Sequence, residues 1–456
     1  MKILLIYPEF PDTFWSFKHA LRFVGRRVSN PPLGLLTVAA LLPESFELRL
    51  VDMNARPLRA ADLAWADYAF ISAMGVQQDS ARSVIGRCQA AGLPVVGGGP
   101  LFSSAPDGFP DVDHLVLGEA EVTLAPFIED LLQGHPRRRY ESTVRADLER
   151  SPAPRWDLLD LRSYASMSVQ FSRGCPHDCE FCNITSLLGR APRTKSGAQI
   201  VRELDALRAT GWTGPVFFVD DNLIGNRRRL KTDLLPALTR WHRAHPYTEF
   251  NTQASIDLAD SPELVSGLVN AGFDTVFVGL ETPNECALLE TNKRQNLRRD
   301  LLADVQRLHR LGLQVQGGFV LGFDADGPDA FAEMVSFIQR AGVVTAMVGL
   351  LQALPGTRLQ ARMRREGRLL DAGSGDNTNG RTNIQPRMGL KALYSGYRSV
   401  LTELYSPPRY YARVRTFLSE FCRGSGPPPP RGLPRLRHWR ALLGSILVLG
   451  VLGKER

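Results

Sequence analysis

The stretch FSRGCPHDCEFC, residues 171–182, decides how the rest of the chain is interpreted. It follows an apolar-alternating run at residues 168–172 and sets three thiols at C-x3-C-x2-C spacing: Cys175, Cys179 and Cys182. Soft thiolate ligands select iron and zinc. A fully protein-ligated [4Fe–4S] cluster has four cysteines. Three thiolates in one tight loop therefore favour a cluster with one iron open to a substrate or cofactor.

Two other interpretations of the loop stay open at this point, a structural zinc site and three incidental buried cysteines. A structural zinc site has four protein ligands, and His177 is the fourth candidate. Because His177 lies between Cys175 and Cys179, it would have to fold back onto the ion that they bind.

The cysteine spacing, with the aromatic Phe181 just before the last cysteine, resembles the signature of the radical S-adenosylmethionine (radical SAM) superfamily. The resemblance implies that the methionine amino and carboxylate groups of SAM chelate the fourth iron. One electron then splits SAM to a 5′-deoxyadenosyl radical, so an electron donor such as flavodoxin or ferredoxin is expected as a partner. Phe181 is expected to cover the cluster or the SAM bound to it.

The composition indicates a globular protein from a reducing compartment. A length of 456 residues suits about three domains. The six cysteines include three outside the loop, which show no paired spacing: Cys88, Cys286 and Cys422. A disulfide framework is therefore not expected. The N-terminus MKILLIYPEF has no small-residue cleavage site and predicts a first strand. We expect a cytoplasmic location.

The net charge of +8 does not by itself predict a nucleic-acid partner, because arginine is scattered along the chain. The sequence shows no nucleic-acid recognition motif, so we do not expect a nucleic acid as substrate. The apolar run at 441–453 has thirteen residues, fewer than the roughly twenty that span a bilayer. Beside Arg435, Arg437 and Arg440 it could rest on a membrane surface, or it could dock on the rest of the protein.

Residues 1–135 alternate short apolar runs with helical ones, which predicts a Rossmann-like (flavodoxin-like) parallel sheet covered on both faces. The expected strands are 3–7, 47–52, 68–72, 94–96 and 114–117. Such sheets bind ligands at the carboxyl ends of their strands, where glycines admit a bulky ligand. Nucleotide-binding and purely structural sheets carry similar glycines.

Beside the cysteine loop, the segments PPLGLLTVAALLP, VDMN, GGGP and GEAE resemble the cobalamin-binding domain that precedes many radical SAM domains. The resemblance implies cobalamin contacts at Gly34, Asp52, Asn54, Met74, Gly75, Gly97, Gly98, Gly99 and Glu119. The chain lacks the D-x-H-x-x-G motif after the first strand, whose histidine ligates cobalt in other classes. We therefore expect cobalamin without a protein histidine on cobalt, and His19 as a packing or surface residue.

Residues 136–165 are basic and proline-rich, as in an interdomain linker, and residues 166–360 alternate strands and helices through six units. These predict a partial (β/α)6 barrel, too few units for a closed eight-fold barrel. Polar residues end its strands, and by resemblance they contact SAM: Asp220, Asp221, Asn222, Gln253, Ser255, Glu281, Gly322 and Gln352. The resemblance assigns the first three to the SAM amino group and Glu281 to the ribose or methionine; helix capping is the alternative.

Residues 361–456 are expected to be mostly helical, with a polar loop at 371–383 and five tyrosines whose expected role is packing. Together the two resemblances imply a cobalamin-dependent radical SAM methyltransferase, in the class that includes hopanoid-methylase-like relatives. The acceptor would be an unactivated carbon of a small molecule or lipid. A radical reaction with a non-methyl outcome, such as cyclisation, and a non-catalytic cobalamin sensor or carrier remain alternatives.

Overall fold

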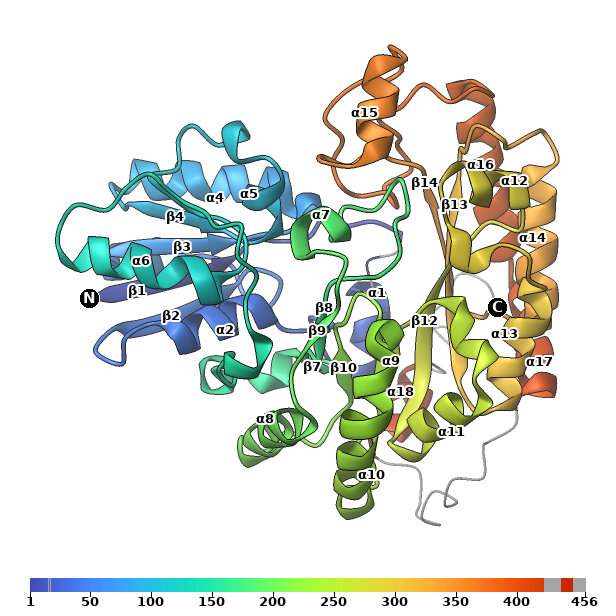
Figure 1. Cartoon of the computed structure of the whole chain (residues 1–456), viewed down its shortest axis with the longest axis horizontal. Coiled ribbons are helices and arrows are strands. Elements are labelled where there is room, and N and C mark those ends of the chain that lie inside the picture. The colour runs from blue at the N-terminus through green and yellow to red at the C-terminus, as the bar shows by residue number, and fades with distance from the viewer. Residues whose placement is uncertain (15, 17, 422–435, 446–456) are drawn as a thin grey trace.

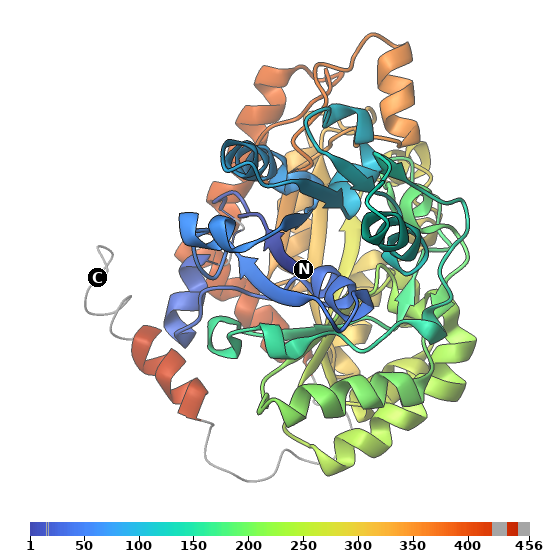
Figure 2. The ribbon, with the colours of Figure 1, turned by 90° about the vertical axis from the view of Figure 1, so that its left-hand side faces the viewer.

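The computed structural model describes residues 1–14, 16, 18–421 and 436–445. Cys422, Arg435, the tetraproline at 427–430 and residues 446–453 of the apolar run lie outside the described residues. Two parallel sheets stand side by side with helix α7 between them (Figure 1). Figure 2 is turned so that the N-terminal sheet faces the viewer, with the strands of the second sheet behind it.

The N-terminal sheet has six parallel strands in the order β2-β1-β3-β4-β5-β6, the flavodoxin-like order extended by one strand. The strands are β1 Lys2–Tyr7, β2 Glu47–Asp52, β3 Tyr68–Ser72, β4 Val95–Gly98, β5 His114–Val116 and β6 Arg139–Tyr140. Alternate residues of β1 point to opposite faces, so Ile3 and Leu5 enter one core and Leu4 and Ile6 the other. The expected α/β fold is confirmed.

Helices cover both faces of this sheet, as a parallel sheet requires. Helices α2 (Leu33–Leu41) and α6 (Ala120–Leu132) pack on the Ile3 face. The opposite face is covered by α3 (Ala60–Trp65), α4 (Gln78–Ala90) and α5 (Pro100–Ser104).

The sheet extends past the boundary expected at residue 135. Strand β6 joins it through the Leu115 N–H, which donates to the Arg138 carbonyl, and the Leu117 N–H, which donates to the Tyr140 carbonyl. The Tyr140 ring packs on Phe127 at 5.3 Å between centroids. A two-residue strand is too short to show a period in the sequence.

The second sheet confirms the partial barrel, since its strands follow in the order β7, β10, β11, β12, β13, β14, all parallel. The first and last of these strands are not paired with each other, so the barrel stays open on one side. The strands are β7 Met167–Val169, β10 Val216–Phe218, β11 Phe250–Gln253, β12 Phe273–Glu281, β13 Gln314–Leu321 and β14 Ala346–Leu350.

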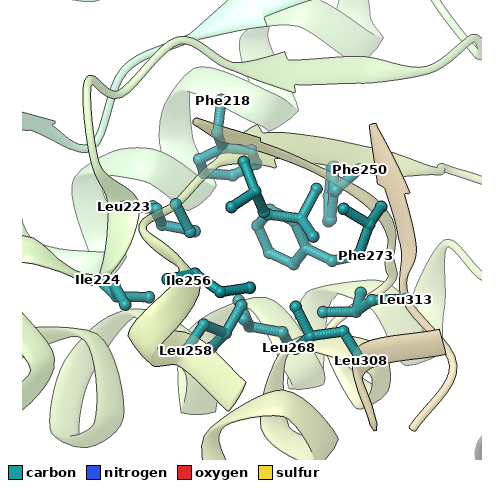
Figure 3. Packing of buried hydrophobic residues seen from close by; sticks show 14 of the residues in the cluster. Phe218, Leu223, Ile224, Phe250, Ile256, Leu258, Leu268, Phe273, Leu308 and Leu313 are labelled. Atoms are coloured by element: carbon teal, nitrogen blue, oxygen red, sulfur yellow. The ribbon is translucent and has the colours of Figure 1, made fainter. Parts of the chain in front are cut away.

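Helices on the outside of the barrel bury a continuous apolar core (Figure 3). Phe218, Phe250 and Phe273 come from three adjacent strands, with ring centroids 5.1 to 5.4 Å apart. Aliphatic side chains surround them, among them Leu223, Ile256, Leu268 and Leu308. This aromatic cluster makes the lower part of the barrel a rigid support for the loops above it. The covering helices are α8 Gly197–Ala209, α10 Leu235–Ala244, α11 Pro262–Asn270, α13 Leu301–Arg310 and α14 Ala330–Ala341.

The C-terminal region is helical, as expected, with α15 (Arg358–Arg365), α16 (Leu390–Leu404) and α17 (Pro407–Glu420). The Tyr397 and Tyr405 hydroxyls donate to carbonyls of β14, at 3.2 and 2.9 Å, so these two tyrosines serve packing. Helix α18 (Leu436–Ser445) lies against residues 22–24, in the long loop after β1. Among the described helices, none is long and apolar enough to cross a membrane.

Candidate active site

A cavity of about 500 Å³ lies between the two sheets. Its walls come from the loops at the carboxyl ends of the N-terminal strands, from α7 (Ile184–Leu188) of the cysteine loop, and from residues 219 and 221 after β10. The loop at 373–375 closes one side. Six of the nine residues expected to contact cobalamin line it: Gly34, Met74, Gly75, Gly98, Gly99 and Glu119.

Two glycines of the cavity wall are required by geometry. Gly99 has φ +83°, and a Cβ there would lie 2.5 Å from the Ser72 hydroxyl. Gly375 has φ +71°, and its Cβ would lie 3.0 Å from the Gly75 backbone. These two glycines let the loop after β4 pack on β3 and the 373–375 loop pack on Gly75, so the cavity wall is continuous between the two halves of the protein. The glycine floor and the apolar side chains around it fit cobalamin.

The other three residues expected to contact cobalamin do not line the cavity. Asp52 accepts a hydrogen bond from the Tyr164 hydroxyl at 2.9 Å and two more from Asn54, whose amide also donates to the Pro8 carbonyl. A Cβ on Gly97 would meet the Phe102 ring at 3.0 Å. Asp52 thus holds Tyr164 of the linker, and Asn54 holds the first loop. Gly97 leaves room for the Phe102 ring to pack on the sheet.

Glu119 and Glu121 also join the two sheets through buried ion pairs. Arg173, on the strand before the cysteine loop, binds Glu121 at 2.7 Å and Glu119 at 3.3 Å. Arg193 binds Glu119 at 2.9 Å and donates to the Ala146 carbonyl in the linker. The GEAE segment therefore holds the cavity wall of the N-terminal sheet against the cluster loop. The ion pairs join residues more than fifty positions apart in the sequence.

The cysteine loop begins and ends on a short hairpin, β8 (Ser172–Arg173) with β9 (Arg193–Thr194). Gly174 has φ +98°, and a Cβ there would lie 2.9 Å from the Gly189 carbonyl oxygen. This close approach of two backbone segments narrows the neck of the loop. The three cysteines of the loop form no disulfide.

The thiols of the loop fit a cluster. Burial raises the pKa of Cys182 to about 12 and also raises that of Cys175, while the backbone N–H groups of Ile184 and His177 donate to these two sulfurs. Such N–H donors stabilise thiolate once a metal binds. His177 places its Nε2 3.3 Å from the Ser255 hydroxyl, where it is occupied away from the cysteines.

Asp220 and Asp221 differ sharply in environment although they are adjacent. Asp220 is fully buried and accepts hydrogen bonds from the backbone N–H of Phe171 and from both the N–H and hydroxyl of Ser172. It therefore positions the start of the cluster loop rather than facing the cavity. Asp221 lines the cavity, and its Oδ2 is buried with no hydrogen-bond partner. A buried, unpartnered carboxylate oxygen fits the SAM ammonium group.

Asn222 and Ser255 bind each other beyond the ends of the adjacent strands β10 and β11, since the Ser255 N–H donates to the Asn222 side chain at 3.1 Å. Gln253 is half-buried at the end of β11. The Gly322 N–H donates to Asp326 at 2.9 Å, and Gln352 donates to the Asp376 and Arg381 carbonyls. The Gln352 bonds hold the loop at 371–383 against the segment that follows β14. For these five residues contact with SAM stays a prediction.

Glu281 forms a buried ion pair that the sequence did not reveal. Its backbone has φ +63° at an irregularity between β12 and β13, and its Oε1 lies 2.6 Å from the Lys293 Nζ. Burial disfavours the charge on Lys293, but Glu281 and Cys179 outweigh it and raise the pKa of the ammonium. Lys293 also lies 5.8 Å from the centre of the Phe181 ring.

Lys293 belongs to a segment, residues 291–295, that braces the cluster loop. The Glu180 N–H donates to the Thr291 carbonyl at 2.8 Å, and Asn292 donates to the Asp178 carbonyl at 2.7 Å. Gln295 places its Nε2 3.6 Å from the Cys179 sulfur. Helix α13 begins only at Leu301, where Asp300 caps it, so this segment lies outside the helix. The polar run TNKRQN, residues 291–296, is the sequence feature that could have indicated a loop at this position.

The protonation of Asp221 yields a stability prediction. Burial raises its pKa from the ordinary 3.8 to about 6. The folded protein therefore holds this proton more tightly than the unfolded chain, and Asp221 lowers stability as pH rises from about 4 through about 6. Asp221→Asn should unfold with a free energy about 3 kcal/mol higher than the parent above pH 6, and the gap should close toward pH 4. Urea titrations across this range without SAM measure it; a gap independent of pH would contradict the assignment.

Comparisons with known proteins agree with this geometry. Residues 26–128 match the B12 binding domain family, residues 169–338 the radical SAM superfamily, and residues 357–456 a domain of unknown function. The chain is 45% identical over 423 residues to an uncharacterized methyltransferase of Synechocystis sp., covering 92% of this chain and 79% of that protein.

Two further comparisons concern a named methylase and a solved structure. The hopanoid C-2 methylase of Rhodopseudomonas palustris is 34% identical over 414 residues, covering 89% of this chain and 77% of that one. The cobalamin-dependent SAM radical enzyme OxsB, with aqua-cobalamin and SAM bound, has the same fold: its TM-score is 0.67 at 16% identity, over 100% of this chain and 73% of that chain. The chain therefore belongs to the radical SAM superfamily and is one of its cobalamin-dependent methyltransferases, with a [4Fe–4S] cluster, SAM and cobalamin as cofactors.

Proposed function

We propose that this enzyme transfers a methyl group to an unactivated carbon of a polycyclic triterpenoid lipid of the hopanoid class. The observation that carries the proposal is the 34% identity to a hopanoid C-2 methylase, which runs through both cofactor domains. The cavity supports it, because aliphatic side chains of α2, α6, α7 and the loop after β14 line it: Leu33, Leu35, Val38, Leu124, Ile184, Leu187, Leu188 and Leu354.

The chemistry explains why two cofactor sites face one cavity. A saturated ring carbon has no acidic proton, so SAM cannot methylate it directly; the cluster with SAM supplies a radical and cobalamin supplies the methyl group. The chain itself positions these groups. Asp221 offers a carboxylate to the SAM ammonium, the glycine-lined floor receives the corrinoid, and the 373–375 loop closes the side of the cavity against water.

A lipid acceptor also suggests how the enzyme reaches its substrate. We infer that this enzyme works in the reducing cytoplasm. It would rest on the membrane surface through α18 and the nearby loop after β1. Exposed apolar side chains lie on these segments: Phe14, Val24, Trp439, Leu442 and Leu443. Arginines precede α18 and continue into it in the sequence, which suits an anionic lipid surface.

The test is an anaerobic assay with SAM, a reductant and a desmethyl hopanoid in anionic vesicles. A methylated hopanoid, 5′-deoxyadenosine and S-adenosylhomocysteine should all form, and the enzyme should float with the vesicles. A tetrapyrrole in place of the hopanoid serves as the control acceptor. Deoxyadenosine without a methylated lipid would contradict the acceptor class, and failure to float would contradict the membrane contact.

A further inference from the structure

Four exposed arginines, Arg190, Arg294, Arg358 and Arg387, surround the outer side of the cluster loop, and we call them the arginine face. Asp178, the residue before Cys179, links two of them. Its Oδ2 lies 3.3 Å from Arg358 and 3.6 Å from Arg190, whose side chains are 55% and 62% exposed. The face therefore begins one residue from a cluster ligand.

The other two arginines extend this face through named contacts. Asn292 donates to the Asp178 carbonyl at 2.7 Å and accepts from the exposed Arg294 at 2.6 Å. Arg387, 68% exposed, lies 3.7 Å from Asp324. The arginines thus come from four separate segments that meet around one loop.

Carboxylates in the same region do not offset this charge at the surface. Glu180 and Asp324 are only 12% and 11% exposed, and both are bound by Arg362. Arg368 adds a second guanidinium on Asp324. Asp178 and Glu366 are 30% and 32% exposed, but each is shared by two arginines, so positive charge stays in excess on the outside.

Radical formation consumes one electron per SAM cleaved, and this electron must reach the cluster from outside. We propose that the arginine face is the docking surface for an acidic one-electron donor protein of the flavodoxin or ferredoxin kind. On docking, the donor loses one electron and the cluster gains it, with no bond made or broken. Charge complementarity steers such an encounter. The face also touches Asp178, which is bonded directly to the cluster ligand Cys179.

The experiment compares two double variants with the same change in charge. Arg190→Glu with Arg387→Glu alters the face and spares Arg294 and Arg358, which brace the cluster loop. Arg240→Glu with Arg243→Glu is the control, because both arginines are exposed on α10, far from α15 in Figure 1. The rate of 5′-deoxyadenosine formation is measured without acceptor lipid, driven either by reduced flavodoxin or by dithionite.

We expect the face variant to raise the KM for flavodoxin at least about tenfold at low salt, with the dithionite-driven rate unchanged. The control variant should match the parent with both reductants. Added salt should raise the KM of the parent toward that of the face variant, since screening removes the same attraction. Equal KM values for the two double variants would overturn the proposal.

If the face variant also loses dithionite-driven activity, hydrogen exchange of the unaltered enzyme with and without flavodoxin locates the docking surface. Flavodoxin should slow hydrogen exchange in peptides that cover residues 176–180 and 291–298. Protection confined to other parts of the chain would overturn the proposal.

Discussion

Alanine at Cys175, Cys179 or Cys182 is expected to abolish both 5′-deoxyadenosine formation and methyl transfer. Each thiolate binds a cluster that has only three protein ligands, so one loss leaves two. The three cysteines are half-buried on one loop whose neck is narrowed at Gly174, and His177 of the same loop lies against Ser255. The measurements are iron content, visible absorption after anaerobic reconstitution, and product analysis.

Cys286→Ala is the matched control, because Cys286 is exposed at the start of α12 (Glu285–Glu290) and outside the loop. It should retain the cluster and the activity of the parent. Cobalamin binding should survive in all four variants, since the cavity wall that receives it comes mainly from the N-terminal sheet. A cysteine variant with a full cluster and normal deoxyadenosine yield would contradict the ligand assignment.

Lys293→Met is expected to destabilise the protein by about 3–5 kcal/mol, because it leaves the buried Glu281 carboxylate without its partner. The methionine side chain keeps the volume and removes the charge. Denaturant unfolding of the variant against the parent measures the loss. The midpoint potential of the cluster should become more negative as well, since a cation beside Cys179 is removed.

The double variant Glu281→Gln with Lys293→Met separates pairing from packing. Removing both charges should restore most of the stability, because no uncompensated carboxylate remains. The cluster potential should stay shifted, since the cation is still absent. Equal destabilisation in the single and double variants would show that Lys293 acts through packing alone.

Several polar residues placed at strand ends by the sequence turned out to serve the protein interior. Asp52 and Asn54, predicted to contact cobalamin, hold Tyr164 and the first loop. Asp220, predicted to bind the SAM amino group, anchors the strand before the cluster loop. Their contacts with the cofactors stay predictions. A carboxylate at a strand end can accept from a ligand or from the backbone, and sequence position does not distinguish the two.

By itself the sequence determined both sheets and an open iron–sulfur site, because these depend on local features: the period of apolar residues along each strand and helix, and three thiols within one loop. SAM and cobalamin followed from the resemblance of these motifs to a known family. Only the tertiary structure decided which polar groups face the cavity. Adjacent residues such as Asp220 and Asp221 point to opposite sides, and pairs such as Glu121 with Arg173 and Glu281 with Lys293 form between segments far apart in the chain or across a turn. Those choices follow from packing and desolvation, which act between elements and leave no period in the sequence.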